Sequence, residues 1–221
     1  MKHIATIGLS LVCLGAFSSL DAASLKKTLS SVPAAELPAK AAQLIADTKT
    51  RDQKPTTINV VKTALGINPA AAPAIVGAIA RAVGPMASVA AGTAAEEQPK
   101  QACAIAKAAA AAAPSEAGQI VLAVCRAAPS EYRCIAVAVS EVAPDASKEI
   151  LEAVAIALPE LGPDIASALE HSTASGPSVP TTLDNTITTK TGGNPKGPPV
   201  IPSSPPTGLP PGSGKNYAKP F

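Results

Sequence analysis

The 221-residue sequence has no tryptophan, two tyrosines and two phenylalanines, so aromatic residues make up only 2% of the chain. Proteins that bind nucleic acid usually combine a dense basic surface with aromatic or arginine side chains that stack on bases. This chain has a net charge of +2, and its weakly acidic middle lies between two weakly basic ends. We therefore expect no nucleic-acid partner.

Histidine is also rare, because only two occur and one of them, His3, lies at the start of the chain. A single remaining imidazole, His171, excludes most histidine-based metal sites and general bases. Asp145, Glu149 and Glu152 are spaced to share one helix face, but no loop of alternating oxygen ligands accompanies them, and we interpret them as a solvated acidic face. The sequence thus predicts no catalytic residue, metal site or cofactor, and the protein is not expected to be an enzyme.

Long apolar runs are lacking after the first 23 residues, since the alanine-rich run that follows Cys103 is interrupted by Lys107 and Pro114. A membrane-spanning helix needs about 20 apolar residues, so no transmembrane span is expected in the mature chain. Residues 1–23 combine a basic start, an apolar run and the small residues Ala22 and Ala23, which is typical of a cleaved secretory signal peptide. The protein is therefore predicted to be exported, either periplasmic or secreted.

Proline, in contrast, is abundant and regularly spaced. Five prolines follow one another at intervals of 15 residues: Pro99, Pro114, Pro129, Pro144 and Pro159. Earlier prolines at 38, 55, 69 and 85 extend the pattern less regularly. Because proline ends a helix, each interval predicts one helix of about 12 residues and a turn. Ser115, Ser130 and Asp145, each directly after a proline, are expected to act as N-caps.

An apolar pattern repeats with the same period inside the units. The sixth, ninth and tenth residues after proline are, for example, Ile120, Ala123 and Val124, and their spacing places them on one helix face. This pattern predicts an all-α fold, an α-solenoid or antiparallel stack of short helices, over residues 24–171. A closed bundle is the alternative. The unit that begins near Met86 lacks the isoleucine, and it is either a weakly packed unit or a bend.

The composition changes after residue 171, and residues 172–221 are rich in proline, glycine, serine and threonine. This segment predicts a disordered tail, because it has too few apolar residues to offset the entropy lost on ordering. Tyr217, Lys219 and Phe221 lie close together near its end. Aromatic residues often anchor interfaces, so these three are the candidate partner-binding residues.

Three cysteines follow the predicted signal peptide: Cys103, Cys125 and Cys134. In an exported protein they are disulfide candidates. Cys125 and Cys134 lie on either side of the turn at Pro129, and an antiparallel hairpin would place them opposite each other. We predict this pairing, and the alternatives are a bridge between Cys125 and Cys103 or no bridge at all.

These observations predict a non-enzymatic, exported interaction or scaffold protein of the cell envelope. Its partner would be an unknown protein or envelope component that binds the helical-repeat surface or the C-terminal peptide. The alternative is a carrier of an apolar ligand or a membrane-associating helical protein. Self-association is a further option, because the end helices of a stack expose apolar surface unless they are capped.

Overall fold

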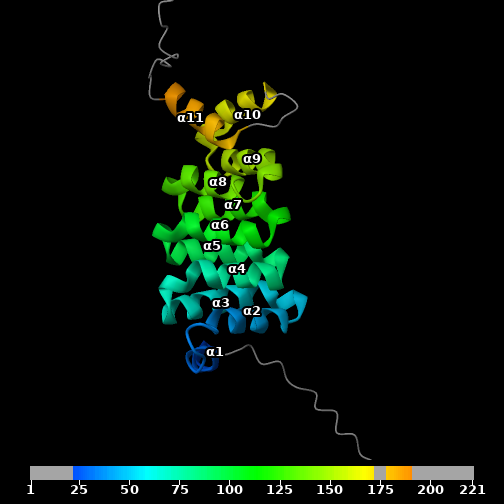
Figure 1. Cartoon of the computed structure of the whole chain (residues 1–221), viewed down its shortest axis with the longest axis vertical. Coiled ribbons are helices and arrows are strands. Elements are labelled where there is room, and N and C mark those ends of the chain that lie inside the picture. The colour runs from blue at the N-terminus through cyan, green and yellow to red at the C-terminus, as the bar shows by residue number, and fades with distance from the viewer. Residues whose placement is uncertain (1–21, 172–177, 191–221) are drawn as a thin grey trace, which may run out of the picture.

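The computed structural model describes residues 22–171 and 178–190, and within these ranges it contains helices and short turns but no strand. It confirms the expected all-α stack of short helices (Figure 1). The helices are α1 (Ala22–Ser30), α2 (Leu37–Ala46), α3 (Gln53–Ile67), α4 (Ala72–Ala82), α5 (Ala87–Glu97), α6 (Ala102–Ala112), α7 (Ala117–Ala127), α8 (Tyr132–Ser140), α9 (Ser147–Ala157), α10 (Gly162–Glu170) and α11 (Val179–Lys190).

A single residue forms the corner between successive helices in most of the stack. These corner residues have φ between −127° and −140° and ψ between 65° and 88°, and they are Asn68, Val83, Gln98, Ala113, Ala128, Ala143 and Leu158. Six of them precede a proline, which disfavours the helical conformation in the residue before it. The Ala113 N–H donates to Ala109, and the Ala113 carbonyl accepts from Glu116. The chain therefore turns sharply without losing backbone hydrogen bonds.

From Asn68 to Leu158, successive corner residues are always 15 residues apart. The prolines do not follow this spacing at Pro85, which is 16 residues after Pro69 and 14 before Pro99. At this corner Gly84 follows the corner residue and Pro85 comes one position later, in the turn Gly84–Met86. Helix α5 therefore keeps the register of its neighbours. Its position in the stack favours a weakly packed unit over a bend.

The expected N-caps are not present. Helices α3 to α10 are each preceded by a three-residue 3-10 turn, and Ser115, Ser130 and Asp145 each occupy the middle of such a turn. No side-chain cap hydrogen bond forms at α7, α8 or α9. The 3-10 turn tightens the entry to each helix, so the proline takes the first position, where a missing N–H costs little.

From α1 to α7, each helix packs against the next helix in the chain and also against the helix two places further on. Helices α2, α4, α6 and α8 form one row, and α1, α3, α5, α7 and α9 form the other. Figure 1 shows the resulting elongated stack, in which α1 and α11 lie at opposite ends. Because successive helices run antiparallel, helices within one row run parallel. These neighbour contacts favour the open stack over the closed bundle.

Five positions of each unit face the interior between the two rows. Counted from the residue that follows the corner, which is the proline in most units, they are the third, sixth, seventh, tenth and eleventh residues after it. In α7 these residues are buried: Ala117, Ile120, Val121, Val124 and Cys125. The sixth and tenth positions were expected in this core. The ninth, expected there too, is buried at Thr93 and Ala153 but half-buried in the other units. It packs within its own row, where Ala108 meets Gly77 and Ala123 meets Gly92.

Both ends of the stack are covered by an additional helix. In α1, Leu25 and Leu29 are buried, and the helix packs against α3. Helix α11 was not expected, because it lies in the segment predicted to be a disordered tail. It buries Val179 and Leu183 and packs against α8 and α10.

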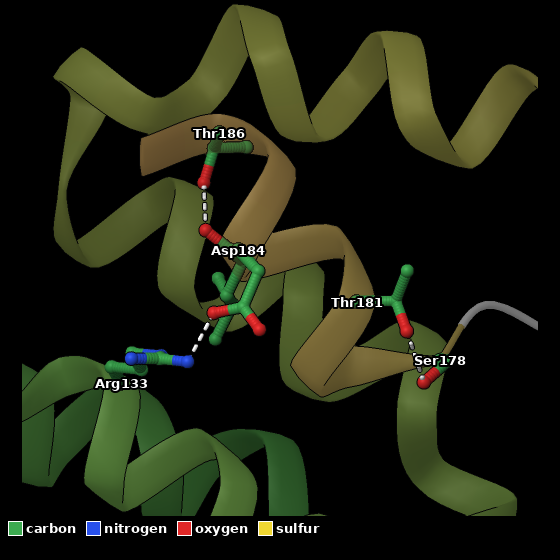
Figure 2. A network of polar contacts seen from close by, with 6 residues as sticks. Arg133, Ser178, Thr181, Asp184 and Thr186 are labelled. Carbon is green, nitrogen blue, oxygen red and sulfur yellow. Dashed lines mark hydrogen bonds and ion pairs between the residues drawn. The ribbon is translucent and has the colours of Figure 1, made fainter. Parts of the chain in front are cut away.

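An ion pair also joins α11 to the stack, between Arg133 of α8 and Asp184 (Figure 2). Within α11, the Thr186 hydroxyl donates to the Leu183 carbonyl at 2.8 Å. The predicted signal peptide, up to residue 21, and the segments 172–177 and 191–221 lie outside the described residues.

Candidate functional site

A groove of about 710 Å³ lies on the surface where α9 packs beside α7. One end is bordered by the turns at Pro114 and Pro144, and the other by Ile156 near the end of α9. The groove is lined by apolar and acidic residues of these elements: Leu122, Val142, Ala153, Asp145, Glu149 and Glu152. We call this surface the α7–α9 groove.

Part of the floor of the groove is formed where α7 and α9 approach each other closely. A Cβ atom built on Gly118 of α7 would lie 3.1 Å from the Glu149 Cβ and 3.3 Å from the Glu149 carbonyl oxygen in α9. Both distances are tighter than ordinary van der Waals contact, so a side chain at this position would push the helices apart. Gly118 therefore contributes backbone rather than a side chain to the groove.

The charge of the groove is predominantly negative. Asp145 lies in the turn before α9, and Glu149 and Glu152 follow on the helix, where all three are exposed. Lys148 approaches Glu152 at 3.8 Å, while no ion pair involves Asp145 or Glu149 among the described residues. Two carboxylates are thus available to a cationic group of another molecule.

Ile156 provides an exposed apolar surface beside these carboxylates. Its exposed fraction is 59%, compared with 37% for Ile67, and these are the two exposed large hydrophobic residues in the described part of the chain. The equivalent residues in the five preceding units are Arg81, Glu96, Ala111, Arg126 and Glu141. An isoleucine at a position that is otherwise polar or small departs from the repeat pattern, and packing does not explain it.

A second hollow, of about 530 Å³, lies beside α11 and is lined by Arg133, Cys134, Glu141 and Pro180 among others. Two of its three charged side chains, Arg133 and Glu141, already have partners within the chain, and Glu131 is the third. Arg133 pairs with Asp184, and Glu141 accepts from Lys107 at 2.6 Å. The α7–α9 groove is therefore the stronger candidate for binding another molecule.

The structure corrects the predicted disulfide. Cys134 is bonded to Cys103, with a Cα–Cα distance of 5.7 Å, and Cys125 is a buried free thiol. Cys103 is in α6 and Cys134 in α8, and their separation of 31 residues is also that of Gly77 and Ala108. The hairpin argument failed because it considered only adjacent helices, whereas Cys125 points into the core between the rows. Burial raises the pKa of the Cys125 thiol to about 12.

The other predicted binding residues, Tyr217, Lys219 and Phe221, lie outside the described residues. His171 ends α10, where its Nδ1 lies 2.6 Å from the Ser167 carbonyl oxygen. The sequence predicted Asp145, Glu149 and Glu152 to form a solvated acidic face, with no role in binding. Ile156 was missed, although a comparison of equivalent positions in successive units would have identified it.

No group of three or more potential metal ligands occurs in residues 22–171 and 178–190. Within the same ranges, none of the helices has the length and apolar character needed to cross a bilayer. Comparisons of the chain with protein-family models, curated proteins and solved structures gave no match. The surface of the stack is therefore the feature from which a function can be inferred.

Proposed function

We propose that this chain is a non-enzymatic, exported interaction protein whose helical stack binds a basic peptide segment of a partner in the α7–α9 groove. The observation that carries the proposal is the exposed Ile156 in a groove with three carboxylates. An apolar side chain of the peptide would cover Ile156, and flanking lysines or arginines would pair with Asp145 and Glu149. This combination of an apolar anchor and a charged rim is typical of peptide recognition.

The two kinds of contact make different contributions. Covering an isoleucine side chain contributes on the order of 1 kcal/mol when about half of it is already buried. Pairs with exposed carboxylates contribute about 0.2–1 kcal/mol each, and salt weakens them. The expected interaction is therefore modest in affinity and sensitive to ionic strength, as is common for scaffold proteins that exchange partners.

The groove is less suited to an acidic lipid or fatty acid. Its volume of about 710 Å³ is large enough for a small apolar ligand. However, the carboxylates of Asp145 and Glu149 would repel an anionic headgroup at the edge of the apolar surface. This charge favours peptide binding over the carrier function.

Export is supported by two features of the chain. The predicted signal peptide occupies residues 1–23, and Leu25 and Leu29, which follow it, are buried in α1. The Cys103–Cys134 disulfide is of the kind that persists in oxidising compartments. Detection of the mature protein in a periplasmic or secreted fraction, with its N-terminus near residue 23, is the expected result.

Selection from a displayed library of random peptides tests the binding function directly. The selected peptides are expected to carry lysine or arginine around one aromatic or aliphatic residue, and their affinity should fall as salt is raised. Ile156→Ser should weaken binding, whereas Ile67→Ser, which changes the other exposed isoleucine, should not. Equal binding to both variants, or selection of peptides without basic residues, would contradict the proposal.

A further inference from the structure

The chain itself contains a segment with the chemistry that the α7–α9 groove requires. After Lys190, residues 191–221 include Lys196, Lys215 and Lys219 and no aspartate or glutamate. Tyr217 and Phe221 are two of the four aromatic residues of the whole sequence. Basic and aromatic side chains thus alternate within one short segment of this otherwise aromatic-poor chain.

The spacing within this segment matches an extended peptide with one binding face. Lys215, Tyr217, Lys219 and Phe221 are each two residues apart, and in an extended chain such residues point to the same side. Lys215 and Lys219 would then be about 13 Å apart along the backbone. Asp145, in the turn before α9, and Glu152 of α9 are about 11 Å apart at roughly the rise of a helix, so flexible lysine side chains can span both.

We propose that residues 215–221 of the same chain occupy the α7–α9 groove, with Tyr217 or Phe221 over Ile156 and the two lysines beside the carboxylates. This inference rests on the proposed function of the groove as a peptide site. It adds that the site is regulated from within the chain, because an external peptide must displace the internal one.

The tether is long enough for this contact. Helix α11 holds the start of the segment on the stack next to α8, through buried Leu183 and the ion pair of Arg133 with Asp184. Eight of the 24 residues between Lys190 and Lys215 are proline, and a proline-rich segment of this length spans up to about 75 Å. Neighbouring helices in a row are about 10 Å apart, so the α7–α9 groove is within reach.

Tethering also favours the chain's own segment over a second copy. A tether that can span the two sites gives an effective concentration of up to about 1 mM, well above that of a free partner in a dilute solution. Contacts of modest strength are then sufficient to fill the groove in much of the population. A competing peptide must be correspondingly abundant or bind more tightly.

Photo-crosslinking in the full-length chain tests the contact. With Tyr217→benzoylphenylalanine, illumination is expected to form crosslinks within one molecule to residues of α7 and α9, at a yield independent of protein concentration. Mass spectrometry of the digested protein locates the attachment. Crosslinks to other helices, the absence of any crosslink, or dimers whose yield rises with concentration would overturn the proposal.

Matched variants identify the surface that holds the segment. Glu149→Gln combined with Glu152→Gln should lower the crosslink yield about fivefold, as expected for two weak ion pairs. Glu96→Gln combined with Glu170→Gln changes the charge equally at exposed positions outside the groove and should leave the yield unchanged. Equal yields from the two double variants would contradict docking in the groove.

A competition experiment separates this inference from the function on which it rests. Phe221→Ser should raise the affinity of a library-selected peptide for the full-length chain severalfold, because the internal competitor is weakened. An unchanged affinity would reject the internal occupant and leave the groove as a peptide site. If no library peptide binds even to this variant, the proposed function itself is rejected.

Discussion

At the residue scale, glycine decides how closely helices of one row approach. A Cβ atom on Gly77 would lie 3.5 Å from the Ala108 carbonyl oxygen, which is an ordinary contact. On Gly118 it would lie 3.1 Å from the Glu149 Cβ. Both residues are inside helices, where replacing glycine by alanine normally stabilises the helix. The gain in helix propensity is the same at both positions, so a difference in the stability of the two variants measures the effect of packing.

Gly77→Ala is expected to raise the free energy of unfolding by roughly 0.5–1 kcal/mol, because it lowers the backbone entropy of the unfolded chain without a clash. Gly118→Ala should show no gain, or a loss, because Glu149 must move away. Urea unfolding of both variants measures the difference. Equal stabilisation by the two substitutions would show that the α7–α9 contact is looser than described.

Cys125 is expected to lower the free energy of unfolding as the pH rises above about 9. Burial raises the pKa of its thiol from 9.0 to about 12, so between these values the unfolded chain releases a proton that the native chain retains. The contribution of this thiol to stability is complete below pH 9 and falls by about 1.4 kcal/mol per pH unit above it.

Cys125→Ala should therefore lower stability near pH 7 by leaving a cavity, but it should flatten the decline between pH 9 and 10. Urea unfolding of the original chain and the variant at several pH values gives the two slopes. Parallel slopes would show that the thiol ionises equally in both states.

At the scale of the helix, the proline period was sufficient to predict helices α2 to α10 and the residues that occupy equivalent positions in them. It did not predict which neighbour each position faces. Cys103 and Cys134 meet because parallel helices two units apart pack with an offset of 31 residues. That offset follows from the stacking geometry of whole helices, and no local pattern in the sequence contains it.

The site was only partly predictable for a related reason. Carboxylates such as Glu149 were visible as one helix face, but the groove exists because α7 lies beside α9 and Gly118 lacks a side chain. Helix α11 was missed because its composition resembles the tail that surrounds it. Its stability comes from burial of Val179 and Leu183 on a stack that the segment itself does not encode.

The disulfide between α6 and α8 is directly testable, because trypsin separates the three cysteines. Without reduction, the peptide 101–107 should remain linked to 134–148, and Cys125 should appear as a free thiol in 108–126. A linkage between 108–126 and 134–148 would instead restore the hairpin pairing. Reduction removes a 31-residue constraint and should lower stability by about 4 kcal/mol in the chain-entropy estimate.

At the scale of the whole molecule, stability of a stack is approximately a sum of unit and neighbour terms, so its weakest layer decides where it opens. Helix α5 is that layer, because its buried residues are small: Ala87, Ala90, Ala91, Thr93, Ala94 and Ala95. In α4 the corresponding core includes Ile75, Val76 and Ile79. Each buried methylene group stabilises the fold by about 0.8 kcal/mol. Because the α5 side chains have fewer of them, burial of α5 contributes several kcal/mol less to stability than burial of α4.

We expect the stack to open at α5 before it unfolds completely. The disulfide clamps α6 to α8, so the opening should spread from α5 toward the N-terminal helices rather than through α7. Hydrogen exchange at increasing sub-denaturing urea measures this, and amides of α5 should exchange at a lower free energy than those of α7. If α5 and α7 exchange only in the same global transition, the array is a single cooperative unit, and its alanine-rich layer is no weaker than the rest.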